Sequence, residues 1–127
     1  MPNLTPRIRV EVYVPIRYEP SYSACLNWII EEFTRLRGGC TVHYDVGGYY
    51  LSRASKLIND RVTVVYSDFP MDWNNTSDQE EVFSYCATLR DFLFENLWEE
   101  EVLITAYSVS HLGELLGRPG LAIVGSI

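Results

Sequence analysis

The chain of 127 residues has little cysteine and no long apolar run. Its three cysteines, Cys25, Cys40 and Cys86, are odd in number and widely spaced, which fits neither a disulfide framework nor a CxxC metal knuckle. We expect them to be small core residues. No apolar stretch approaches the roughly 20 residues of a bilayer-spanning helix, and residues 1–6 lack the pattern of a signal peptide. We therefore expect a cytoplasmic protein with no membrane partner.

Positive charge is also scarce, because ten Lys and Arg residues face 17 Asp and Glu residues and the net charge is −7. Such an acidic protein lacks the basic footprint that phosphate backbones attract, so nucleic acid is not an expected partner. The phosphate-binding patterns GxGxxG and GxxxxGK[ST] and the nucleophile pattern GxSxG are absent as well. The sequence thus predicts neither a cofactor nor a metal, and it favours a binding module over an enzyme.

Apolar residues, by contrast, make up 47% of the chain and follow clear periods. Residues 7–17 alternate, and their apolar side is formed by Ile8, Val10, Val12, Val14 and Ile16. Side chains of a strand point to opposite faces with a period of two. This segment is therefore predicted to be a strand with one buried face and one polar face that is free to carry function.

Two helices are predicted from apolar residues at helical spacing. The first covers residues 21–37 and stops at Gly38-Gly39, since glycine readily takes the left-handed conformation of helix ends. The second begins at a capping box formed by Ser77 and Glu80, and its apolar stripe runs from Val82 to Leu97. The acidic residues near its end, Glu99 to Glu101, fit a solvated surface.

The other predicted strands are residues 61–67 and residues 102–109. A further segment from Cys40 to Leu51 is interrupted at Gly47-Gly48 and is predicted to be a bent or bulged strand or a hairpin. The order strand, helix, strand, strand, helix, strand predicts an α+β fold, a ferredoxin-like βαββαβ sandwich with two helices on one face of an antiparallel sheet. We expect a single domain, 1–127, with a core at 7–109 and a C-terminal extension at 110–127.

The extension is predicted to add a short helix at residues 112–116 and an extra strand at residues 121–124. That strand, Leu121 to Val124, is wholly apolar, so at a free edge it would invite aggregation. We expect it to pair either with the sheet or with another chain, and the latter alternative favours a homodimer.

The polar face of the predicted sheet holds the candidate functional residues. If the apolar side of the first strand faces the helices, the opposite side gathers one set of residues from each strand. These sets are Arg9, Glu11 and Tyr13; Thr41, His43 and Asp45; Thr63, Val65 and Ser67; and Thr105 and Tyr107. Their mixture of charges and hydroxyls suits either a wet contact between two sheets or the floor of a site for a small polar ligand.

His43 and Asp45 are the most specific candidate pair for chemistry on this face, because residues two apart on a strand point the same way and a carboxylate can orient an imidazole. They are weak candidates for acid–base catalysis, or for metal binding with Glu11 as a third ligand. The simpler interpretation is a surface histidine with a local hydrogen bond. His111 is also expected to be a surface residue.

The segment 68–76 is rich in Asp, Asn and Pro and is predicted to be a loop that binds a partner through Asp68 and Trp73. Alternatively, Phe69 and Trp73 fold back over the core. Tyr49, next to Gly47-Gly48, could close a pocket or simply pack.

Taken together, the residues predict a small-ligand- or protein-binding module with a regulatory or assembly role. The expected binding residues are Arg9, Tyr13, Tyr49, Tyr107, Asp68 and Trp73. The alternative is a small enzyme with acid–base chemistry centred on His43.

Overall fold

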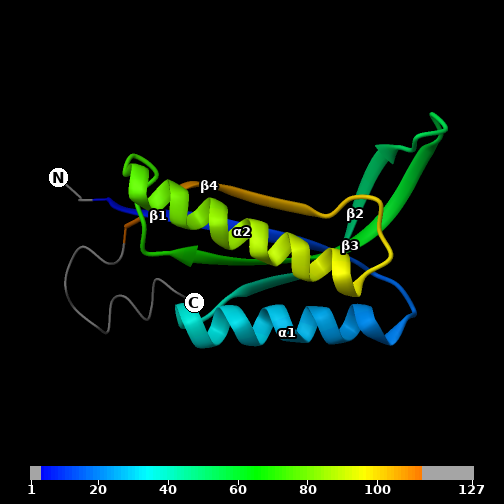
Figure 1. The fold of residues 1–127 in the computed structure, drawn as a ribbon, viewed down its shortest axis with the longest axis horizontal. Helices are drawn as coiled ribbons and strands as arrows, with labels where there is room; N and C mark the ends of the chain where they lie inside the picture. The colour runs from blue at the N-terminus through cyan, green and yellow to red at the C-terminus, as the bar shows by residue number, and fades with distance from the viewer. Residues whose placement is uncertain (1–3, 113–127) are drawn as a thin grey trace.

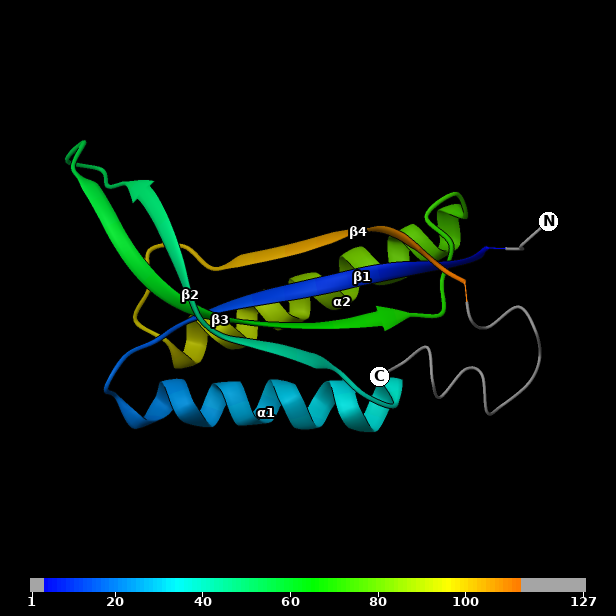
Figure 2. The same ribbon diagram turned by 180° about the vertical axis from the view of Figure 1, so that it is seen from behind.

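The computed structural model describes residues 4–112, which form four strands and two helices. In chain order they are β1 (Thr5–Pro15), α1 (Pro20–Arg37), β2 (Thr41–Leu51), β3 (Leu57–Phe69), α2 (Thr76–Asn96) and β4 (Leu103–His111). The strands form one antiparallel sheet in the order β2-β3-β1-β4, with both helices on one face (Figures 1 and 2). The predicted ferredoxin-like fold is confirmed. The predicted C-terminal strand and nearly all of the predicted short helix lie outside the described residues.

Strand β1 lies inside the sheet between β3 and β4, and its alternation sets the core. Ile8, Val10 and Val12 have no exposed surface, and they pack with Ile29 and Phe33 of α1 in one cluster. The prediction of a strand with one buried face is therefore confirmed. Neither described helix is long and apolar enough to cross a membrane.

The predicted C-terminal end of α1 is observed, whereas the predicted cap of α2 is not. Helix α1 ends at Gly38, whose φ of 86° is left-handed and whose backbone N–H donates to the carbonyl oxygen of Thr34. Helix α2 is capped by Asn75, whose side-chain oxygen accepts from the backbone N–H of Asp78 at 3.0 Å. The predicted capping box at Ser77 is therefore wrong, and Asn75, the residue just before the helix, takes that role.

The predicted orientation of β3 is also wrong. Thr63, Val65 and Ser67 face the helices and are 3%, 0% and 4% exposed, whereas the sequence analysis put them on the polar face. The reason is that residues 62–66 are mostly apolar on both sides, so the local pattern does not fix which side is buried. Pairing with β1 decides it, because Val12 lies opposite Val65 and Val10 opposite Ser67.

Strand β2 contains a bulge, but not at the glycines where it was predicted. The register shifts between His43 and Val46, and Asp45 takes a φ of 57°. Beyond the bulge β2 stays paired with β3 as far as Leu51. This outer part of the hairpin, residues 46–61, projects past the two helices and is called the hairpin arm below (Figures 1 and 2).

Candidate binding face

The sheet face opposite the helices is called the open sheet face. Its members occupy alternate positions on four strands, as the pairing of Glu11 with Tyr66 and Thr105 shows. They are Thr41 and His43 on β2, Val64, Tyr66 and Asp68 on β3, Arg9, Glu11 and Tyr13 on β1, and Thr105, Tyr107, Val109 and His111 on β4. No described helix covers this face, since Figures 1 and 2 show both helices on the other side.

A charge cluster lies at one end of the open sheet face, around Asp68. Arg9 donates two hydrogen bonds to its carboxylate, from Nε to Oδ1 at 2.7 Å and from Nη2 to Oδ2 at 3.0 Å, and His111 Nε2 lies 2.6 Å from Oδ2. Partial burial raises the pKa of Asp68, but the hydrogen bonds and charges of Arg9 and His111 outweigh it and leave the pKa below its ordinary value. The Arg9 guanidinium also lies 4.2 Å from the centre of the Tyr66 ring, where a cation and an aromatic ring attract each other.

A second cluster surrounds Glu11 in the middle of β1. Its Oε1 accepts from Tyr13 Oη at 2.9 Å and from Thr105 Oγ1 at 3.0 Å, and its Oε2 accepts from Tyr107 Oη at 2.6 Å. Burial raises the pKa of Glu11, but the three hydroxyl donors and the nearby Arg9 lower it below its ordinary value. Glu11 is therefore a stable carboxylate near neutral pH, and it holds three side chains of the face in place.

The carboxylates of the two clusters have their hydrogen-bond partners within the chain. Both oxygens of Asp68 and of Glu11 accept hydrogen bonds from other side chains of the face. The hydroxyls of Tyr13 and Tyr107 keep acceptor capacity, because a phenol that donates one hydrogen bond can still accept another. Covering the face therefore costs less free energy than covering carboxylates without partners, and the face can still bind polar groups.

The structure does not bring together the residues proposed for catalysis. The His43 ring stacks on Tyr66 with centres 5.8 Å apart, while Asp45 accepts from Arg61 Nε at 2.7 Å because the bulge turns it toward that residue. Strand β3 separates His43 from Glu11, so their backbones are two strand spacings, or about 10 Å, apart. Within residues 4–112, no three His, Cys, Asp or Glu side chains are grouped to hold a metal ion.

The predicted binding residues divide into two groups. Arg9, Tyr13, Asp68 and Tyr107 meet on the open sheet face, although Asp68 belongs to β3 and not to a loop.

Tyr49 and Trp73 lie elsewhere. Tyr49 lies on the hairpin arm and is 70% exposed. Trp73 packs edge-on against Phe83 of α2, with ring centres 5.7 Å apart, and contacts the core cluster. The alternative in which Phe69 and Trp73 fold over the core therefore describes the structure, and Phe69 is fully buried.

Four members of the face were not predicted from the sequence: Val64, Tyr66, Val109 and His111. The signal for His111 was present, because it is two and four positions after Val109 and Tyr107 and so shares their side of a strand. Val64 and Tyr66 were missed because β3 was given the wrong orientation.

Fold and face together define a ferredoxin-like α+β protein with an open, polar sheet surface. The sequence matches no known family model and no curated protein. Among solved structures, it is similar to CutA1 from Oryza sativa, with 16% identity, a TM-score of 0.52, and coverage of 96% of this chain and 94% of the other.

It is also similar to the divalent cation tolerance protein Cut A1 from Thermus thermophilus. That likeness has 10% identity, a TM-score of 0.50, and coverage of 80% of this chain and 82% of the other. At these identities the likeness shows the fold.

Proposed function

We propose that the protein is a homo-oligomeric binding module with a regulatory or assembly role. Its open sheet face contacts another copy of the chain and takes a small polar ligand there. The observation that carries the proposal is the internal hydrogen bonding of the face, in which the charged groups of Arg9, Asp68 and Glu11 all have partners among neighbouring side chains.

The physical reason is the cost of removing charges from water. An unpaired charge that enters an interface loses its hydration without compensation, whereas a charge already held by hydrogen bonds loses far less. Asp68 and Glu11 make their hydrogen bonds within one chain, so a second molecule can cover them without supplying partners. Tyr107, which is 40% exposed, then offers an aromatic surface and a hydroxyl to whatever covers the face.

The two similar structures give further support for this class of function. Both are CutA1 proteins, and the one from Thermus thermophilus is named a divalent cation tolerance protein. A small sheet-based binding module is consistent with that likeness. Divalent cations are accordingly one ligand class to be tested with the small polar molecules.

The test of assembly is the solution mass of a Tyr107→Glu variant, measured by light scattering. A second carboxylate beside Glu11 brings uncompensated charge into the covered face, so we expect the oligomer to dissociate while the circular dichroism spectrum stays unchanged. Tyr18→Glu is the matched control, because Tyr18 is fully exposed in the turn before α1. It should keep the wild-type mass.

Two results would contradict the proposal: a wild-type mass equal to one chain, or a Tyr107→Glu variant that assembles like the control. Ligand binding is tested separately by thermal unfolding in the presence of small carboxylates, phosphates and divalent cations. A ligand of the open sheet face should raise the melting temperature of the Tyr18→Glu control and not that of Tyr107→Glu.

A further inference from the structure

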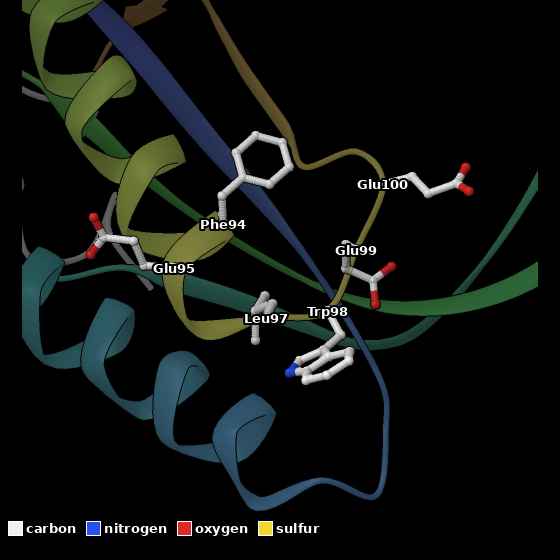
Figure 3. Close-up of a pocket in the computed structure, with 6 residues that line it drawn as sticks. All are labelled: Phe94, Glu95, Leu97, Trp98, Glu99 and Glu100. Carbon is white, nitrogen blue, oxygen red and sulfur yellow. The ribbon is translucent and has the colours of Figure 1, made fainter.

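A groove at the C-terminal end of α2 lies outside the open sheet face. It has a volume of about 450 Å³ and is lined by Phe94, Glu95, Leu97, Trp98, Glu99 and Glu100 (Figure 3). Trp98 is 93% exposed and Phe94 is 42% exposed. The two rings point in different directions at the edge of the groove (Figure 3), and an exposed tryptophan is among the residues that contribute most to binding a partner.

The acidic residues of the groove differ in how well they are neutralised. Glu99 is held by Arg17 at 3.3 Å and accepts from Tyr22 Oη at 2.6 Å. Glu100 has only a 3.7 Å contact with Arg53 and is 67% exposed, and among the described residues no hydrogen bond or ion pair involves Glu95. The groove thus combines exposed aromatic rings with two carboxylates that still lack close partners.

The tip of the hairpin arm, residues 49–57, has the complementary character. It carries Arg53 and Lys56, the latter the one lysine of the sequence, and no acidic residue. Its apolar side chains Tyr49, Leu51 and Leu57 are 70%, 70% and 69% exposed. The two positive charges of the tip are opposite in sign to the two poorly paired carboxylates of the groove, and the exposed apolar side chains of the tip can pack against the exposed aromatic rings beside them.

We propose that the hairpin tip of one copy docks into the α2 groove of a second copy. This inference rests on the proposed homo-oligomeric function and names a contact for it. The docking occurs between copies because one chain alone leaves both surfaces uncovered. Within the described part of the chain, the ion pair between tip and groove is that of Arg53 with Glu100 at 3.7 Å, and Trp98 stays 93% exposed.

Charge reversal tests the contact. A tip variant carries Arg53→Glu and Lys56→Glu, and a groove variant carries Glu95→Lys and Glu100→Lys. We expect the dissociation constant of the oligomer to be more than about tenfold higher for each variant alone than for the wild type, because like charges then face each other across the interface. Mixing the two variants should restore association, because the acidic tip of one then meets the basic groove of the other. A contact within one chain cannot produce that rescue.

The control variant carries Arg35→Glu and Arg90→Glu, which make the same charge change at exposed sites on the two helices. It should associate like the wild type, and circular dichroism should show all variants folded. If the wild type is an oligomer and the tip variant keeps its mass, or if the mixture fails to associate, the docking of tip and groove is refuted while the homo-oligomer stands. If the wild type is a single chain, the proposed assembly fails as well.

Discussion

Replacing Asp68 with asparagine tests how much the charge cluster of the open sheet face stabilises the fold. The Asp68 side chain is 14% exposed and Arg9 is 26% exposed, so solvent screens their ion pair only in part. Hydrogen bonds to charged groups contribute about 1.5–3 kcal/mol each, and asparagine keeps one acceptor oxygen for Arg9 or His111. We therefore expect the free energy of unfolding to fall by about 2 kcal/mol at pH 7.

The matched control is Asp45→Asn, which breaks another aspartate–arginine pair. Asp45 and Arg61 are separated by the same 2.7 Å, but their side chains are 67% and 51% exposed. Exposed ion pairs contribute little because water and salt screen them. Asparagine also tolerates the φ of 57° at this position, so backbone strain does not confuse the comparison. The control should unfold at nearly the wild-type urea concentration.

The pH dependence adds a second readout. The carboxyl of Asp68 titrates near its ordinary value of 3.8 in the unfolded chain and below that value in the folded protein. Its contribution to stability is therefore fully present above the unfolded pKa and is lost as the pH falls through the folded pKa. The difference in the free energy of unfolding between the wild type and Asp68→Asn should be present at neutral pH and should shrink below about pH 4.

Urea unfolding at a fixed chain concentration measures these effects, because self-association would make the apparent stability depend on concentration. The reasoning is refuted if both variants lose the same stability. It is also refuted if the Asp68→Asn deficit stays unchanged from neutral pH into the acid range where the protein remains folded.

Two further predictions concern the core and the helix cap. Phe33→Ala should cost about 3–5 kcal/mol in urea unfolding, since Phe33 is fully buried and packs edge-on against Phe69; a loss under about 1 kcal/mol would contradict this packing. Asn75→Ala should cost about 1 kcal/mol because Asn75 caps α2, whereas Ser77→Ala should be nearly neutral; the reverse order would restore the capping box that the sequence predicted.

The order of elements could be predicted because its signals are local. The alternation of residues 7–17, the helical spacing before Gly38 and the acidic start of α2 each depend on a few neighbouring residues. Only the exact cap moved, from Ser77 to Asn75, because several residues before α2 are able to cap it. Seven members of the open sheet face were also predicted, since they follow from the alternation of side chains along β1, β2 and β4: Arg9, Glu11, Tyr13, Thr41, His43, Thr105 and Tyr107.

Only the tertiary structure decided the contacts between residues that are far apart in the sequence. Arg9 meets Asp68 across 59 positions, and no local pattern specifies that pairing. The orientation of β3 was equally undetermined, because Val62, Val64 and Val65 place apolar groups on both of its sides. The bulge at Asp45, which separates it from His43 and turns it to Arg61, depends on the register of β2 against β3. By itself the sequence determined which segments become strands and helices, because side-chain periodicity and caps depend on neighbouring residues. Strand pairing joins residues far apart in the sequence, and this pairing decided which side chains share a face.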